Sequence, residues 1–80
     1  MSELTEKIHA ILTEDFELPA EALTEDANLR EDLGLDSLDA VDLANRLEEQ
    51  TGIKIALRTL GELDTLRDMY ALVEKLANEN

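Results

Sequence analysis

The sequence predicts an all-α fold, an antiparallel bundle of three main helices plus one short helix. Apolar residues make up 44% of the 80 residues and aromatic residues only 2%, so Leu, Ile, Val and Ala must fill the core. Such a composition suits helix-on-helix packing better than sheets, which favour aromatic side chains. Apolar residues also recur at helical spacing between capping residues. At this length we expect one domain, residues 1–80, with a core of nearly marginal size.

The first helix is predicted from about Glu3 to about Asp15, with Ser2 placed to cap its start. Four apolar residues at helical spacing form its core-facing stripe: Leu4, Ile8, Ile11 and Leu12. Residues 17–28 then mix Pro, Thr, Asn and acids without a sustained period. This stretch is predicted to be a long crossing loop, and loops of that length usually serve a function.

The second helix has clear boundary signals. Gly34 indicates a turn, Asp36 is the predicted N-cap, and the helical pattern runs from Ser37 to about Gln50. Gly52 follows directly, where a glycine commonly ends a helix in the left-handed conformation.

Two further helices are predicted in the last third of the chain. A short one spans Leu57 to Leu63, interrupted by Gly61. Thr65 and Asp68 have the spacing of a capping box, which predicts the start of the last helix. Its core stripe is predicted to be Leu66, Met69, Tyr70, Val73 and Ala77.

The predicted second helix carries apolar residues on two sides. A sector of about 100°, the usual width of a core-facing stripe, contains Ala40, Leu43, Ala44 and Leu47. Leu38 and Val41 fall on roughly the opposite side and are predicted to be exposed. Asp42, Glu48 and Glu49 project near them. Exposed aliphatic groups among carboxylates favour transient docking of a basic partner, although ordinary surface exposure of two apolar residues is the alternative.

The charge of the chain is strongly negative and uneven. Seven Lys and Arg face twenty Asp and Glu, a formal charge of −13. Fifteen of the acids and three of the bases precede Gly52, a charge of −12, which leaves −1 for the remainder. Such a charge disfavours nucleic acid and anionic membranes as partners and favours basic protein surfaces. The alternative is a solvated coat that only confers solubility.

Several chemistries have no support in the residues. The chain has no cysteine, so a disulfide, a thiolate metal site or a thiol nucleophile is excluded. Residues 32–36 place glycine wrongly for a calcium loop, and no metal site is predicted. His9 is predicted to be a surface or boundary residue rather than a ligand or catalyst. No apolar run approaches a membrane span, and we expect a soluble, cytoplasmic monomer.

Residues 31–43 contain the motif that carries most functional information. Here Gly34 precedes the triplet Asp36-Ser37-Leu38, which opens an acidic helix. This string resembles the signature of the acyl carrier protein family. The similarity extends to the first-helix stripe, to residues 29–33, 48–49 and 52–55, and to the last helix, and so covers nearly the whole chain. The triplet alone also describes any well-capped helix, so its context decides.

The resemblance implies an acyl-carrier-protein-like bundle that is not itself an enzyme. By resemblance, Ser37 accepts 4′-phosphopantetheine from coenzyme A, with Asp36 and Leu38 beside it in the cofactor site. The arm would carry acyl intermediates as thioesters for fatty-acid, polyketide or related lipid biosynthesis. A phosphodiester at this position suits the positive end of a helix dipole. A serine hydroxyl needs a neighbouring base to react as a nucleophile, and the only histidine, His9, lies on the first predicted helix, away from the Ser37 motif. A separate phosphopantetheinyl transferase, which uses magnesium in this family, must therefore attach the arm.

The resemblance also implies partners and a shelter for the acyl chain. Partners would be the transferase and acyl synthases, ligases or acyltransferases with basic docking surfaces. The predicted partner face consists of Asp36, Leu38, Asp39, Val41, Asp42, Glu48 and Glu49. Family members often shelter the acyl chain among the helices. Residues expected near such a cleft are Phe16, Leu43, Leu47 and Ile55.

Two departures from many fatty-acid carriers favour a specialised carrier. Asn45 stands where they have an aliphatic residue, and residues 56–60, Ala-Leu-Arg-Thr-Leu, replace an acidic third helix. One alternative is a carrier of amino-acyl or aryl groups from a ligase or peptide-synthetase pathway. The other is an unmodified acidic interaction module in which Ser37 merely caps a helix.

The density of carboxylates predicts that salt stabilises the fold. Thermal melts at about 0.01 M and about 0.5 M NaCl, and with millimolar MgCl₂, test this, because salt shortens the range of repulsion between acids. We expect the melting temperature to rise with salt and with magnesium. A melt that ignores ionic strength would show that the acids are too dispersed or too well paired to repel.

Overall fold

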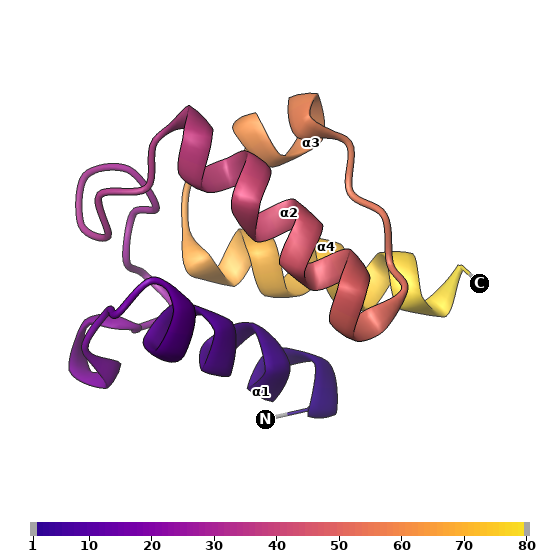
Figure 1. The fold of residues 1–80 in the computed structure, drawn as a ribbon, viewed down its shortest axis with the longest axis horizontal. Coiled ribbons are helices and arrows are strands. Elements are labelled where there is room, and N and C mark those ends of the chain that lie inside the picture. Colours follow the sequence, from indigo (N-terminus) through magenta and orange to yellow (C-terminus); the bar gives the residue numbers. More distant parts are fainter. Residues whose placement is uncertain (1, 80) are drawn as a thin grey trace.

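The computed structural model describes residues 2–79, and the regular elements in this range are all helical (Figure 1). The long helices are α1 (Glu3–Ala10), α2 (Ser37–Thr51) and α4 (Leu66–Asn78), and α3 (Leu57–Gly61) is short. In Figure 1, α1 runs against α2 and α4, which point in the same general direction. The predicted all-α bundle of three main helices and one short helix is confirmed.

Helix α1 begins at the predicted cap and ends in a wider turn. The side-chain oxygen of Ser2 accepts a hydrogen bond from the backbone N–H of Thr5 at 3.2 Å. After Ala10 the chain continues as a π-helical turn, Ile11–Asp15, so the predicted helix is correct in extent and not in its last hydrogen bonds. Ile8, Ile11 and Leu12 are buried, and Leu4 is partly buried.

The long loop between the π-helical turn and α2, which contains the predicted crossing loop of residues 17–28, is packed against the bundle. It includes a 3-10 turn, Ala20–Ala22, and continues to the start of α2. Five of its apolar residues belong to the core: Leu23, Ala27, Leu29, Leu33 and Leu35. Backbone bonds join it to the chain around the start of α4, from Leu29 N–H to the Asp64 carbonyl and from Leu66 N–H to the Ala27 carbonyl.

A guanidinium reinforces this attachment of the loop. Arg67 of α4 lies 2.7 Å from a carboxylate oxygen of Asp26 and 3.5 Å from one of Glu25. The backbone N–H of Arg67 also donates to the Glu25 carbonyl. Side chain and backbone of one residue therefore hold the same part of the loop.

The boundaries of α2 are those that the sequence predicts. Asp36 and Asp39 form a capping box in which each side chain accepts a hydrogen bond from the backbone N–H of the other. Gly34 and Gly52 have φ angles of 68° and 76°, the left-handed region that glycine enters without penalty. The helix extends one residue beyond the predicted Gln50, to Thr51.

The predicted capping box of Thr65 and Asp68 opens α4. The boundary of α3 was predicted less well, because the helix ends at Gly61 and not at Leu63. The N–H groups of Glu62 and Leu63 donate to carbonyls three residues earlier, those of Thr59 and Leu60, so the chain forms a turn there and not a further turn of α-helix.

One cluster of aliphatic side chains fills the space between the helices. Its least exposed large members are Ile8, Ile11, Leu12, Leu43, Leu47, Leu66, Met69 and Val73. Two members of the predicted α4 stripe, Tyr70 and Ala77, are only partly buried. In α2, Leu43, Ala44 and Leu47 are buried and Ala40 is partly buried, which confirms its core-facing side.

The cap of α4 makes stability depend on pH. Hydrogen bonds from the backbone N–H groups of Thr65 and Asp64 hold the pKa of the Asp68 carboxyl below its usual value. A pKa that is lower in the folded chain stabilises the fold above the ordinary value, and that stabilisation is lost as the pH falls through the folded value. We expect Asp68→Asn to lower the melting temperature at pH 7, with the difference shrinking by about pH 3.

Asp64→Asn is the matched control. It removes the same charge near the same helix start, but only backbone groups of Asp64 take part in hydrogen bonds among the described residues. Its melting temperature should stay close to that of the unmodified sequence at both pH values. An equal loss at both pH values for Asp68→Asn would contradict the role assigned to its ionised form.

Candidate functional site

Ser37 is the first residue of α2 and is exposed. Its hydroxyl makes no hydrogen bond with the described residues 2–79, because Asp36 performs the capping. The hypothesis that Ser37 merely caps the helix is therefore wrong: the cap is the residue before it. A serine that is not needed for the cap presents its hydroxyl to other molecules.

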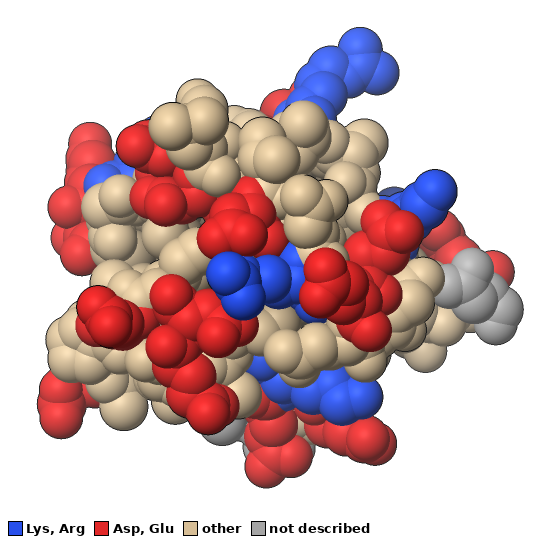
Figure 2. Space-filling view, viewed as in Figure 1, with Lys and Arg blue, Asp and Glu red and all other residues tan. Residues whose placement is uncertain are grey.

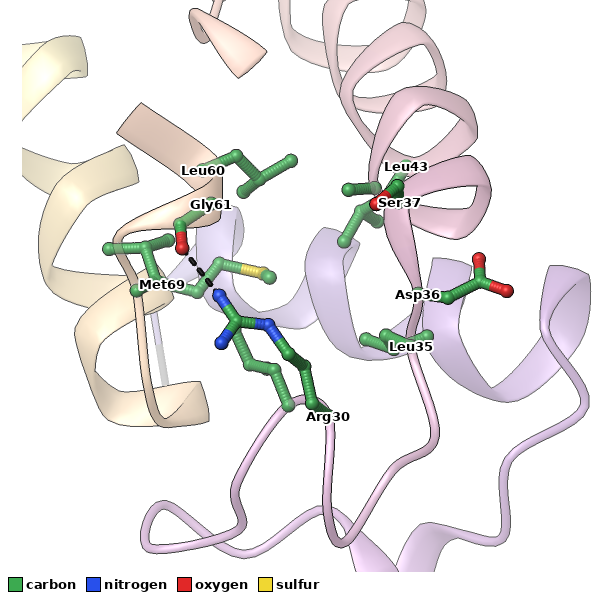
Figure 3. A pocket seen from close by; sticks show the side chains of 11 residues that line it. Arg30, Leu35, Asp36, Ser37, Leu43, Leu60, Gly61 and Met69 are labelled. Atoms are coloured by element: carbon green, nitrogen blue, oxygen red, sulfur yellow. Dashed lines mark hydrogen bonds between the residues drawn. The ribbon is translucent and has the colours of Figure 1, made fainter. Parts of the chain in front are cut away.

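The surroundings of Ser37 favour a negatively charged substituent. The first N–H groups of a helix lack acceptors within the helix, and the dipole adds positive potential there. Asp36 counteracts this with its own charge, but its carboxylate points away from the cavity described below (Figure 3). An anionic group on the Ser37 oxygen would thus lie beside the N-terminus of α2, while the Asp36 carboxylate points away from the cavity.

A cavity of about 280 Å³ lies beside Ser37 (Figure 3). Its walls come from the loop before α2, from the first turns of α2, from α3 and from α4. The apolar lining includes Leu29, Leu35, Ala40, Leu43, Leu60 and Met69. Arg30 reaches across from the loop, and its guanidinium donates a hydrogen bond to the carbonyl of Gly61. The site therefore joins a free hydroxyl to an apolar space.

One of the four residues expected near an acyl cleft lines this cavity. Leu43 lines the cavity, but Phe16, Leu47 and Ile55 do not. The reason is that α3 and the loop before α2 flank the first half of α2, so the space opens there. Leu47 is fully buried further along α2, and Ile55 is buried in the segment after it. The signal in the sequence that points to this space is the group of leucines before Ser37, of which Leu29 and Leu35 line the cavity.

The outer side of α2 carries two exposed apolar residues, as predicted. The exposed fraction is 79% for Leu38 and 39% for Val41. Leu57, at the start of α3, is 52% exposed and was not predicted as part of this surface. Because α3 packs against α2, an exposed apolar residue is also present on the neighbouring helix.

The acids of α2 differ in how far they are paired. Arg46 lies 3.1 Å from a carboxylate oxygen of Asp42 and 3.2 Å from one of Asp15, at the end of the π-helical turn. Asp42 is therefore partly neutralised and its side chain is restrained. Glu48 and Glu49 are exposed, and neither belongs to an ion pair within residues 2–79.

Figure 2 shows how the charges are distributed on one face. Acidic side chains cover much of the area over α1 and α2, with fewer basic ones between them. A basic side chain projects above α3. This arrangement agrees with the excess of acids before Gly52. None of the described helices has the length and apolar character needed to cross a membrane.

Known proteins with related sequences define the family. The chain matches the family described as phosphopantetheine attachment site over residues 6–73. It is 44% identical over 70 residues to an acyl carrier protein of Saccharopolyspora erythraea, which covers 88% of this chain and 74% of the relative. The chain belongs to the acyl carrier protein family. The prosthetic group of this family is 4′-phosphopantetheine, and its members carry acyl groups rather than catalyse reactions.

Further acyl carrier proteins match over almost their entire lengths. One from Treponema denticola is 38% identical over 74 residues, 92% of this chain and 95% of the relative. Acyl carrier protein 2 of Ralstonia nicotianae is 39% identical over 75 residues, 94% and 93% respectively. The match therefore includes all four helices and not only the region around Ser37.

Proposed function

We propose that Ser37 is the attachment residue for 4′-phosphopantetheine and that residues 1–80 act as one monomeric carrier domain. The observation that carries this proposal is the exposed Ser37 hydroxyl, which makes no hydrogen bond with the described residues and lies on the rim of an apolar cavity. Asp36 closes the helix start, so modification of Ser37 breaks none of the hydrogen bonds of the cap. When bound, the arm supplies a terminal thiol, which the chain itself lacks.

The carried groups are acyl intermediates of fatty-acid, polyketide or related lipid biosynthesis in the cytoplasm. The acidic, partly apolar outer side of α2 supports this assignment over a carrier of amino-acyl or aryl groups. Asn45 and Arg58 favour a specialised carrier, because both replace the residue type usual in the general fatty-acid carriers. Arg58 is exposed on α3, where a dedicated partner enzyme would read it.

Partners dock on the outer side of α2 and the start of α3. The predicted face of Asp36, Leu38, Asp39, Val41, Asp42, Glu48 and Glu49 gains Leu57. Leu38 and Leu57 provide apolar area for burial, at ~25 cal/mol per Å². Glu48 and Glu49 steer basic enzymes such as the transferase and acyltransferases. Asp42 contributes less attraction because Arg46 already compensates its charge.

Modification of Ser37 is tested by intact mass. Incubation with coenzyme A, Mg²⁺ and a broad-specificity transferase should add one phosphopantetheinyl group, and Ser37→Ala should abolish the addition. The fold should be unchanged, since Asp36 and not Ser37 caps α2. Ser2→Ala is the matched control, because Ser2 is the other serine of the chain and also lies at a helix start. Addition to Ser37→Ala would refute the assignment of the site, and no addition to the original chain would refute the carrier proposal.

The docking face is tested by charge reversal at Glu49. Glu49→Lys should lower kcat/KM of the transferase about fivefold at low salt, the equivalent of roughly 1 kcal/mol, because it replaces attraction by repulsion. The loss should shrink at high salt. Val41→Ala should lower kcat/KM to a similar extent at both salt concentrations, because it removes apolar contact.

Glu21→Lys is the matched control for charge, since Glu21 is equally exposed but lies in the loop before α2. It should leave kcat/KM close to that of the unmodified sequence. Equal losses for Glu21→Lys and Glu49→Lys would show that net charge, and not this face, governs the encounter. Arg58→Glu should spare the transferase and impair only a dedicated downstream enzyme.

A further inference from the structure

Arg30 is the one cationic residue that lines the cavity beside Ser37. The rest of the lining is mainly aliphatic, and Arg30 is the lining residue that carries a charged hydrogen-bond donor. Figure 3 shows the Arg30 side chain extending from the loop before α2 toward the end of α3. It thus crosses the cavity between two segments that are distant in sequence.

The backbone at Arg30 is held in place by its neighbours. The side-chain oxygen of Asn28 accepts hydrogen bonds from the N–H groups of Arg30 and Glu31, at 3.0 and 2.9 Å. Asn28 is itself fixed through its N–H, which donates to Asp32 at 2.7 Å. The far end of the side chain is fixed by the Gly61 carbonyl. A residue anchored at both ends keeps its donors in a constant position, which is the condition for selective recognition.

The guanidinium retains capacity for another partner. The guanidinium has five N–H donors, and within residues 2–79 it makes one hydrogen bond, to the Gly61 carbonyl. Arg46 and Arg67 each contact two carboxylates, whereas Arg30 is in no ion pair with a described acid. Arg58 likewise pairs with no described acid, so what distinguishes Arg30 is its place beside an apolar cavity. Its remaining donors face water or a ligand.

We propose that Arg30 makes this carrier selective for short acyl groups that bear an oxygen beyond the thioester, such as a 3-oxo group or a terminal carboxylate. The inference rests on the proposed attachment at Ser37, because only a group on that residue is delivered to this cavity. The aliphatic walls hold the carbon chain, and Arg30 donates hydrogen bonds to its oxygen. The volume of about 280 Å³ is just below the range of ~300–1,000 Å³ usual for ligand pockets, which favours a short chain.

The selectivity follows from the cost of an unmet polar group. A fully apolar chain in the cavity would displace water from Arg30 without replacing the lost hydrogen bonds. An acyl group with an oxygen within reach restores them. Because Arg30 is exposed at the edge of the cavity, the preference is expected to be modest rather than absolute.

The test compares acyl groups of equal length on the whole chain. A transferase loads coenzyme A analogues with amide-linked butanoyl, 3-oxobutanoyl or succinyl groups, and also coenzyme A itself. The measurement is the melting temperature of each acylated form relative to the same variant with the unacylated arm. In the original sequence, the two oxygen-bearing groups should raise this temperature by about 4 °C more than butanoyl does. In Arg30→Met this difference should disappear, and Arg30→Lys should keep part of it.

Arg58→Met is the matched control, because it removes an exposed arginine of α3 that does not line the cavity. It should keep the full preference. Comparison within each variant cancels any stability lost with the bond to Gly61. Loaded proteins that show no preference, or a preference that persists in Arg30→Met, would overturn this inference and leave the attachment proposal intact.

Two further outcomes are separable. The bare arm, without an acyl group, could itself raise the melting temperature relative to the protein without the arm. If Arg30→Met abolishes that rise, Arg30 contacts the phosphate of the arm and not the acyl group, and the inference is wrong. If intact mass shows no loading, the attachment proposal fails, and this inference fails with it.

Discussion

The attachment of the long loop to the start of α4 is the constraint on which the rest of the structure depends. Backbone hydrogen bonds join Leu29 to Asp64 and Leu66 to Ala27, and Arg67 holds the acids of the same loop. These contacts fix where the chain enters α2. They therefore determine where Ser37 stands and which space remains between the loop and α3. Without them the loop would carry its buried leucines into water, at a cost of about 1.5–3 kcal/mol for each fully buried side chain.

A second feature of the fold is that some charged residues form ion pairs between segments, whereas others do not. The arginines that pair with acids are used to tie segments together: Arg46 joins α2 to the end of the π-helical turn, and Arg67 joins α4 to the loop. Glu48 and Glu49 have no such task among the described residues. Internal cohesion relies on Arg46 and Arg67, whereas Glu48 and Glu49 remain exposed at the surface.

Most of the fold could be predicted from the sequence because its helix boundaries depend on short-range signals. The N-cap Asp36, the capping box of Thr65 with Asp68, and Gly52 act within one turn of chain, and each was identified correctly. The partnership of Asp39 with Asp36 was not predicted. The exposure of Leu38 followed from helical periodicity for the same reason. The π-helical turn after Ala10 depends on packing against other segments, so no local pattern predicted it.

The cavity was beyond local reasoning. Its lining combines residues from the loop, α2, α3 and α4, and the contact between Arg30 and Gly61 spans 31 positions of sequence. The pairing of Asp15 with Arg46 likewise depends on how two segments pack. Such contacts follow from the tertiary arrangement. Charge and periodicity in the sequence do not show which residues of distant segments come into contact. The motif located the serine, and only the structure located the space beside it.

Capping of α2 by Asp36 has a thermodynamic consequence for Ser37, the proposed attachment residue. Because the Ser37 hydroxyl takes part in no hydrogen bond with the described residues, a substituent on it removes no native interaction. Folding and derivatisation are then linked only through contacts that the substituent itself makes. The difference in the free energy of unfolding between the modified and the unmodified chain then equals the free energy of the contacts that the attached group makes with the folded protein.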